Sequence, residues 1–447
     1  MALTKYPSGS LKELMAISFP LMLNSLSWLF MILVDRLFLA RYSLAALNAA
    51  AVAGMLAYAF TLAPYVITSM SEAFVAQYFG AKRYAYLGRP IWQMLWFSLL
   101  SSLLFFPLAI FGTPLLTQGA LESTYFSYLL YFGPFVAAGG ALCSFFIGQG
   151  KILLVTVIIV SANIINMILD YVLIFGIEGF IPSMGIKGAA IATNVGEVLQ
   201  IVILLGVFLN KTNRERFFTH RIRLHFPLFL RIIRVAAPLA VFTMMELIGW
   251  STFYKLMRNA SIVHITISSI CQTLIFGLWF VGEGVGKAAT AICGNLIGEK
   301  NHEMVPKVIK TGLKIFAPFF VLSLIGLLLF PQSFVALFFS AENMMIPTTL
   351  ENITFCLILS LIYIFFAWVR LLFNGVLTAA GDTRFLLYTG AFSVWCFVVI
   401  PIYFLLNHFN ISVETAWMIG AVYGLILTLI YSYRFKKGYW KKVLLID

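Results

Sequence analysis

Long apolar runs, separated by short polar segments, recur along the whole chain. Each run has about 20 residues or more, the length that an α-helix needs to cross the hydrocarbon core of a bilayer. We place the runs at 14–40, 46–79, 91–112, 122–147, 152–176, 185–209, 235–257, 262–297, 311–333, 349–378, 385–407 and 412–434. The pattern predicts an all-α polytopic membrane protein with twelve transmembrane helices. The second, eighth and tenth runs exceed the required length, so we expect these helices to tilt or to project from the bilayer.

Polar residues interrupt the fifth run at helical spacing. Asn163, Asn166 and Asp170 are separated by three and four positions, so they share one face of a helix. A carboxylate facing lipid at mid-membrane costs about 2.5 kcal/mol or more, so Asp170 should point into a polar interior. The first run carries Asn24, expected in the substrate cavity, and Asp35 on one stripe. We therefore predict that Asp35 and Asp170 meet inside the bundle and bind a proton or Na⁺; the alternative is that each is only an internal hydrogen-bond partner.

We also assign three further polar residues of the first half. Thr193 stands in the small-residue opening of the sixth run, where close helix packing is favoured. Its hydroxyl could complete the cation site, or the residue could serve in packing alone. Glu72 and Glu197 are expected near helix ends, in structural roles.

Four of the charged residues inside the apolar runs of the second half are assigned to the predicted substrate cavity. Glu246 stands in the seventh run, and Arg370 in the tenth needs a buried partner such as Glu246. Glu283 and Lys287 are one helical turn apart. Such a pair either neutralises itself within the bundle or faces the cavity.

Composition narrows the range of activities. The chain has 447 residues, of which 62% are hydrophobic and 11% charged, whereas soluble domains have roughly 45–50% and 25%. No sizeable soluble domain is therefore expected. The five cysteines lie in apolar runs without a CxxC pair, so no disulfide, haem or zinc site is predicted. We find no phosphate-binding loop or catalytic motif, and expect no enzyme and no cofactor; a gradient of H⁺ or Na⁺ is the expected energy source.

The net charge of +13 is explained by membrane orientation. Of the 30 Lys and Arg residues, 22 lie in the termini and one set of alternate loops, and 4 lie in the opposite loops. Cytoplasmic loops carry the excess of basic residues in membrane proteins. We therefore expect a multi-pass protein of the plasma (inner) membrane with both termini in the cytoplasm. The basic residues are not interleaved with aromatics on a soluble face, so nucleic-acid binding is not expected.

The most polar connection, 210–234, separates two sets of six spans. It defines a predicted N-lobe at 1–209, a cytoplasmic linker at 210–234 and a C-lobe at 235–447. Each half holds an even number of spans, so both enter the membrane in the same sense. A parallel repeat of this kind has its axis along the membrane normal and a substrate site between the halves.

Residues at constant offsets support the repeat. Pro20 and Pro238 lie 218 positions apart, and the same offset relates Gly80 to Gly298. Later in each half, Gly150-Lys151 and Gly381-Asp382 lie 231 positions apart, where the fifth span of each half begins. The matches indicate two related six-helix lobes.

With these residues in place, the chain resembles the multidrug and toxic compound extrusion (MATE) family of the MOP flippase superfamily. The resemblance rests on motifs spread over nearly the whole chain: Phe19-Pro-Leu, Leu33-Val-Asp35, Gly148-Gln-Gly-Lys151, Asn166-Met-Ile-Leu-Asp170, Gly188-Ala-Ala-Ile-Ala-Thr193, Ala237-Pro238 with Glu246, and Ala380-Gly-Asp-Thr-Arg384.

The resemblance implies two lobes around a central cleft that opens alternately to each side. It also implies an N-lobe cation site at Asp35, Asn166, Asp170 and Thr193. Some members use a glutamate in the seventh span, which Glu246 matches. An acidic residue of the tenth span in those members would fall near Ala367 here, and its absence favours the N-lobe site. Arg36, Lys287 and Arg370 are unusual for a cation exporter and leave room for an anionic or zwitterionic substrate.

Three functions remain open at this point. The first is an H⁺- or Na⁺-coupled antiporter that exports amphipathic small molecules by alternating access, acting as a monomer within the lipid bilayer. The second is a flippase for lipid-linked precursors, favoured if the cleft is basic and open to lipid. The third is a membrane receptor or scaffold that transports nothing. Paired carboxylates within the membrane argue against the third.

Overall fold

The computed structural model of the chain describes residues 3–336, 347–442 and 445–446. Among these residues, helices are the regular secondary structure, joined by turns and short loops, and one isolated bridge links Ile177 and Ile181. Eleven helices or helix groups are long and apolar enough to span a membrane, and the bent pair α6–α7 gives a twelfth. The all-α fold with twelve predicted spans is thus confirmed. The first six are α1 (Leu11–Tyr42), α2–α3 (Leu44–Ser69, Ser71–Gly80), α4–α5 (Gly88–Pro107, Thr113–Leu116), α6–α7 (Ala120–Tyr131, Gly133–Ile147), α8 (Ile152–Phe175) and α9 (Ile186–Phe208). The second six are α11 (Phe226–Ala260), α12 (Ile262–Gly298), α13 (Val305–Leu329), α15 (Pro347–Ala380), α16–α17 (Thr383–Val394, Ile400–Phe409) and α18 (Val413–Lys436).

The polar connection between the halves is shorter than its composition predicts. Within 210–234 lie a short helix, α10 (Lys211–Phe217), and the beginning of α11, which starts at Phe226 and not at 235. Pro227 stands in the first turn of α11, where its missing N–H costs nothing. The helix continues beyond the apolar run because Leu228 and Ile232 are buried against the N-lobe residues Met70 and Phe74.

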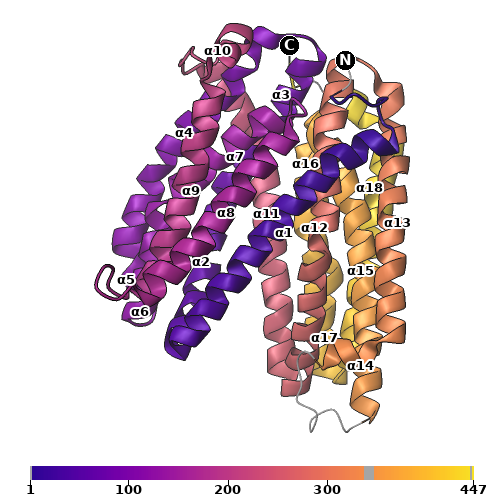
Figure 1. Ribbon diagram of the computed structural model, residues 1–447. Coiled ribbons are helices and arrows are strands. Elements are labelled where there is room, and N and C mark those ends of the chain that lie inside the picture. Colours follow the sequence, from indigo (N-terminus) through magenta and orange to yellow (C-terminus); the bar gives the residue numbers. More distant parts are fainter. Residues whose placement is uncertain (1–2, 337–346, 443–444, 447) are drawn as a thin grey trace.

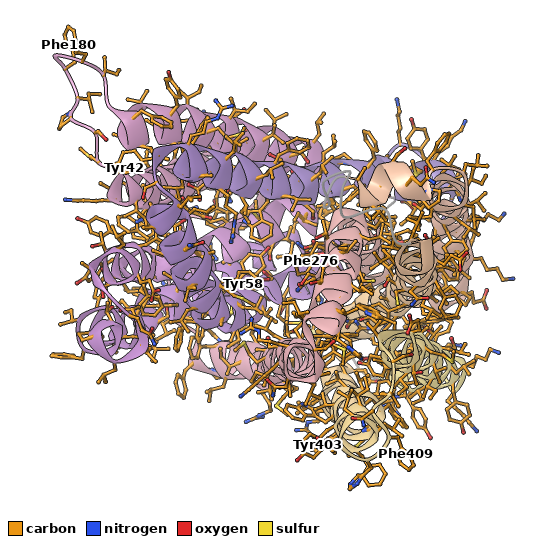
Figure 2. The ribbon with its side chains drawn as sticks, turned by 90° about the horizontal axis from the view of Figure 1, so that it is seen from below. Tyr42, Tyr58, Phe180, Phe276, Tyr403 and Phe409 are labelled. Atoms are coloured by element: carbon orange, nitrogen blue, oxygen red, sulfur yellow. The ribbon has the colours of Figure 1, made fainter. Side chains whose placement is uncertain are left out.

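Two lobes are visible in Figure 1. Helices α1–α9 form one bundle and α11–α18 the other. The bundles meet at the end that holds both termini and α10, and they diverge toward the opposite end. Figure 2, seen from that opposite end, shows Tyr58 of α2 and Phe276 of α12 on the two sides of the space between the lobes. Both side chains are exposed.

The internal repeat is confirmed in the local backbone. Lys82 and Lys300, 218 positions apart, both adopt left-handed conformations, with φ of 59° and 61°. Ser43 and Ser261, at the same offset, are extended residues that separate the first two helices of each lobe. Such unusual backbone positions do not recur in register by composition alone, so the two halves share one architecture.

The repeat also shapes the contact between the lobes. A Cβ added to Gly80 would collide with the backbone carbonyl of Asn295, and one added to Gly298 would collide with the carbonyl of Gln77. The two contacts are exchanged by the 218-residue offset, so they lie about the pseudo-two-fold axis. Gln77 also donates from Nε2 to the carbonyl of Ala379 at 2.8 Å. The end that holds the termini is therefore closed by direct backbone packing.

Helix α1 contacts both lobes. Near its start, a Cβ on Gly284 of α12 would meet Met22, so α1 and α12 pack closely there. In its second half it packs against N-lobe helices, where Asn163 of α8 donates to Ser27 at 2.9 Å. Figure 1 shows α1 running obliquely from the C-lobe at the closed end to the N-lobe at the open end. A shift of this helix would therefore change its contacts with both lobes.

Candidate functional site

The two aspartates singled out by the sequence lie together inside the N-lobe. Asp35 of α1 is 9% exposed and Asp170 of α8 is fully buried. Their charges are close enough to interact with each other and with Tyr125 of α6. The Tyr125 hydroxyl donates to Oδ2 of Asp35 at 3.3 Å. Three helices thus bring two carboxylates and one phenol to one buried place.

The site has unsatisfied hydrogen-bonding groups. Oδ1 of Asp35, both carboxylate oxygens of Asp170 and both amide atoms of Asn166 are buried without a hydrogen-bond partner among the described residues. Most buried polar atoms in proteins do have a partner, in the protein or in ordered water. A group of orphaned oxygens around two carboxylates is a place for a proton, a cation or water. Asn163, one turn away on the same face, instead donates to Ser27 and ties α8 to α1.

Helix α9 packs closely over this part of α8. A Cβ on Gly196 would lie 3.2 Å from Cβ of Asn166, and one on Gly188 would lie 2.5 Å from the carbonyl oxygen of Leu173. Asn194 donates to the carbonyl of Tyr128 at 2.9 Å. The small residues of α9 therefore allow its backbone to seal the site on this side.

Thr193 lies on α9 and is half-buried. Its hydroxyl donates to the carbonyl of Ala189, one turn earlier on the same helix, at 3.1 Å. The hydroxyl therefore donates its hydrogen bond within the helix. Its oxygen still has lone pairs that could coordinate a cation. The assignment of Thr193 to the cation site stays a prediction.

Aromatic rings lie beyond the aspartates toward the open end. Phe38, one turn after Asp35, makes edge contacts with Tyr171 and Phe175, with ring centroids 5.8 and 6.0 Å apart. Tyr42 extends the cluster to the end of α1. The rings add apolar surface on this side of the site, where Tyr171 and Tyr42 are themselves exposed.

The donor set suits a hard cation or a proton. Carboxylate and amide oxygens are ligands typical of hard cations, and Na⁺ and H⁺ sites in carriers lie near mid-membrane. Among the described residues there is no group of three or more His, Cys, Asp or Glu side chains that could hold a metal ion. The assignment of the Asp35–Asp170 pair as the charged partner of an ion stays a prediction.

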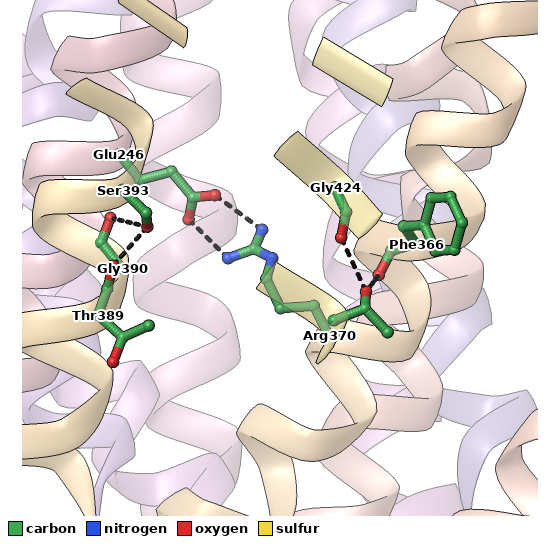
Figure 3. Close-up of polar contacts among 8 residues, drawn as sticks. Glu246, Phe366, Arg370, Thr389, Gly390, Ser393 and Gly424 are labelled. Atoms are coloured by element: carbon green, nitrogen blue, oxygen red, sulfur yellow. Dashed lines mark hydrogen bonds and ion pairs between the residues drawn. The ribbon is translucent and has the colours of Figure 1, made fainter. Parts of the chain in front are cut away.

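The C-lobe holds a different charged pair. Nη2 and Nη1 of Arg370 lie 2.7 and 3.3 Å from the two carboxylate oxygens of Glu246, as Figure 3 shows. Arg370 is 3% exposed, and Tyr363 and Tyr423 are among the groups around it. The partner predicted for Arg370 is confirmed. Removing one member of a buried pair leaves an uncompensated charge and costs about 3–5 kcal/mol, so substitutions here have to neutralise both residues together.

A second ion pair joins the lobes. Nζ of Lys287 lies 2.9 Å from Oε1 of Glu283, one turn away on α12. Oε2 of Glu283 accepts from the hydroxyl of Ser25 on α1 at 2.9 Å. Both side chains of the pair are about one-third exposed. The sequence left open whether this pair neutralises itself or faces the cavity; it does the first and remains accessible for the second. Nearby, Oδ1 of Asn24 is buried without a partner among the described residues.

Two acidic residues were undervalued in the sequence. Glu72 does lie at a helix start, in the first turn of α3, but this start is a break inside the second span and not the edge of the membrane. Glu197 lies in the middle of α9 and not near its end. Both interact electrostatically with the Cys143 thiol of α7. Their position within apolar runs was the signal that could have found them.

The two lobes have the same backbone arrangement, but they do not both contain the buried carboxylates. Asp35 corresponds, at the 218-residue offset, to Phe253, which is buried. The α16–α17 span, which corresponds to α8, contains no Asp or Glu. The buried carboxylate pair is therefore confined to the N-lobe.

Two related six-helix lobes, a buried polar site within one of them and charged residues where they meet define a polytopic membrane transporter. The sequence model of the MatE family matches residues 20–172 and 235–404, one segment in each lobe. The chain belongs to the MatE family of multidrug and toxic compound extrusion transporters, as its motifs indicated.

Relatives and solved structures agree with this assignment. A "Probable multidrug resistance protein NorM" of Bradyrhizobium diazoefficiens is 26% identical over 91% of this chain and 89% of its own length. A protein of the same description from Thermotoga maritima is 23% identical over 96% of this chain and 93% of its own length. A MATE crystal structure in complex with MaL6 superposes with a TM-score of 0.83 at 17% identity, over 98% of each chain. A MOP superfamily transporter from Pyrococcus furiosus, whose binding pocket is described as having reverse polarity, gives 0.82 at 15% identity, over 97% of each chain. At these identities the structures show a common fold.

Proposed function

We propose that this transporter is an H⁺- or Na⁺-coupled antiporter that exports amphipathic small molecules by alternating access between its lobes. The observation that carries the proposal is the buried pair Asp35 and Asp170, whose orphaned oxygens lie beside the unpartnered amide of Asn166. Two carboxylates without a cation are costly at this depth, so the site favours binding a proton or Na⁺. The multidrug relatives support small molecules as cargo.

Helix α1 offers a route from the ion site to the lobes. It carries Asp35 in the N-lobe and Ser25, whose hydroxyl contacts Glu283 of the C-lobe. An ion bound at Asp35 changes what this part of α1 can pack against, and Ser25 carries the change to the interface. Two arrangements of α1 with different ion affinities would couple the ion to the opening of the lobes.

The flippase alternative depended on a basic cleft. Two of the three basic residues singled out in the sequence are paired with a glutamate: Lys287 with Glu283, and Arg370 with Glu246. The third, Arg36, interacts electrostatically with Asp35. Their charges are largely compensated, so the antiporter is the better supported function.

Export is tested in cells that lack their own multidrug pumps. Cells that express the protein should accumulate less ethidium, a lipophilic cation, than cells with an empty vector. A protonophore, or removal of Na⁺, should abolish the difference because the ion gradient supplies the energy. Equal ethidium accumulation with and without the protein, repeated with neutral and anionic dyes, would remove the proposal.

We further propose that both termini and the connection 210–234 face the cytoplasm. The basic residues gather there, and both termini and α10 lie at one end of the molecule (Figure 1). A single cysteine in place of the exposed Glu215, in an otherwise cysteine-free chain, should react with an impermeant maleimide only in inverted vesicles. Labelling in intact cells would show that the connection faces the outside, which is the opposite orientation. In the proposed orientation the described conformation is open to the outside.

A further inference from the structure

The ammonium group of Lys287 belongs to the C-lobe but lies against the N-lobe. Its closest partner is Glu283 on its own helix, at 2.9 Å. It also interacts electrostatically with Glu72 of α3, and its Nζ is 6.0 Å from the ring centroid of Tyr65 of α2. One C-lobe cation thus compensates charge on a neighbouring lobe.

Glu72 is an N-lobe carboxylate that interacts electrostatically with this cation. It is 7% exposed, and its Oε1 is buried without a hydrogen-bond partner among the described residues. Lys287 contributes a positive charge to its electrostatic environment. Glu197 lies in the same region: it interacts electrostatically with the Cys143 thiol of α7, as Lys287 and Glu72 do.

We infer that Glu72 binds the cationic group of the exported molecule, and that Lys287 is a tethered cation that displaces it when the lobes close at this end. The inference rests on the proposed export function and names the binding group. It uses residues outside the Asp35–Asp170 site, so the exported cation and the coupling ion have separate carboxylates.

The lobe contacts next to Glu72 explain why the site alternates. One turn along α3, Ala76 packs against Gly294 of α12, where an added Cβ would lie 2.7 Å from the Ala76 side chain. When the lobes separate here, Lys287 and its partner Glu283 leave together on α12, while Glu72 stays on α3. Its carboxylate then has no counter-charge within a weakly polarisable interior, which is costly unless a cation enters.

The same geometry gives the direction of release. Closure at this end returns Lys287 to Glu72 and buries the carboxylate, so a bound cation is driven toward the open end. Tyr58 lies on that route: it interacts electrostatically with Glu283 and Lys287 and is exposed between the lobes in Figure 2. With Tyr65 it offers aromatic faces, which attract organic cations. The ligand class is an amphipathic organic cation with an aromatic ring.

The test measures ethidium binding to the purified full-length protein by fluorescence polarisation, and ethidium export by the same variants in cells. Glu72→Gln should weaken binding by about tenfold or more, because one charge–charge contact in a protein is worth a few kcal/mol. Lys287→Met should have the opposite effect: tighter binding by about tenfold and slower export, since the displacing charge is gone. Lys287→Arg should behave as wild type.

Two further variants keep the test valid. Lys287→Met leaves Glu283 unpaired, so the double substitution Glu283→Gln with Lys287→Met is measured in parallel and should also bind more tightly. Adding Glu72→Gln to this background should remove the gain. Glu215→Gln, on the exposed face of α10, is the matched control and should change nothing.

The outcomes separate this inference from the function on which it rests. A wild-type protein that neither binds nor exports ethidium contradicts both. Wild-type export of ethidium with an affinity that Glu72→Gln and the Lys287 variants leave unchanged contradicts this inference alone. Tighter binding in both neutralised-lysine variants, lost again with Glu72→Gln, establishes it.

Discussion

Asp170→Asn should abolish ion-coupled export while the protein stays folded. The amide has nearly the shape of the carboxylate but cannot ionise or bind a proton. Neither oxygen of Asp170 has a hydrogen-bond partner among the described residues, so the folded state loses no observed contact. We expect export to fall by about 100-fold or more, because even the outer partners of ion ligands contribute about 10–100-fold.

Initial rates in inverted membrane vesicles, at matched expression, measure this effect. Asp35→Asn should have nearly the same effect, although its remaining hydrogen bond from Tyr125 can persist with the amide oxygen. Glu215→Gln is the control for loss of a carboxylate and should leave the rate unchanged. Wild-type rates in Asp170→Asn would show that the buried pair has no part in coupling.

Gly298→Val should hold the lobes apart at the end that carries the termini. In the described conformation any Cβ at Gly298 collides with the backbone carbonyl of Gln77, which cannot rotate away as a side chain can. Overpacking of this kind costs about 1–3 kcal/mol. The cost applies only while the lobes touch here, so the equilibrium should shift away from this conformation by about 5–150-fold. Export should fall with it, since one of the two states becomes rare.

Spin labels at Arg89 of α4 and Lys310 of α13, both exposed, can report the separation of the lobes. In Gly298→Val the distance distribution should move to longer values, and Gly80→Val should do the same by symmetry. Gly206→Val is a matched control, because a Cβ there meets nothing within 4 Å. An unchanged distribution in both interface variants would mean that the lobes do not separate at this contact.

The features that could be predicted best from the sequence are those whose alternatives cost much free energy in a membrane. Twelve apolar runs became twelve spans because backbone groups in lipid have to be paired within helices. Asp35 and Asp170 came together because a charge on the lipid face is expensive. The repeat was visible because Gly80, Gly298 and their neighbours sit where the two lobes touch.

Features set by contacts between the lobes were harder to predict. The surroundings of Glu72 depend on the break in the second span and on its electrostatic interaction with Lys287 of the other lobe, and neither has a local pattern. The start of α11 was placed too late because its first turns are held by N-lobe residues and not by lipid. Arg370 pairs with Glu246. The two residues lie on different helices, so their separation in the sequence could not establish that contact.

Divergence within the repeat explains why one lobe carries the proposed ion site. The backbone at Ser43 is repeated at Ser261, yet Asp35 is replaced by Phe253 in the second lobe. The second lobe has instead Glu246 and Arg370, which neutralise each other. Glu246 and Arg370 already compensate each other, so the second lobe has little need of an ion. In the N-lobe, two carboxylates share the single positive charge of Arg36, an exposed residue that interacts electrostatically with Asp35.

The central claim is that the coupling ion binds at Asp35 and Asp170 and nowhere in the C-lobe. The most direct test is ion flux driven by substrate in proteoliposomes, measured as pH change and as ²²Na⁺ movement when an ethidium gradient is imposed. The account predicts flux of one of these ions with wild-type protein, and with the paired control Glu246→Gln with Arg370→Met. It predicts none with Asp35→Asn or Asp170→Asn. Full ion flux in both aspartate variants, or loss only in the C-lobe control, would contradict it.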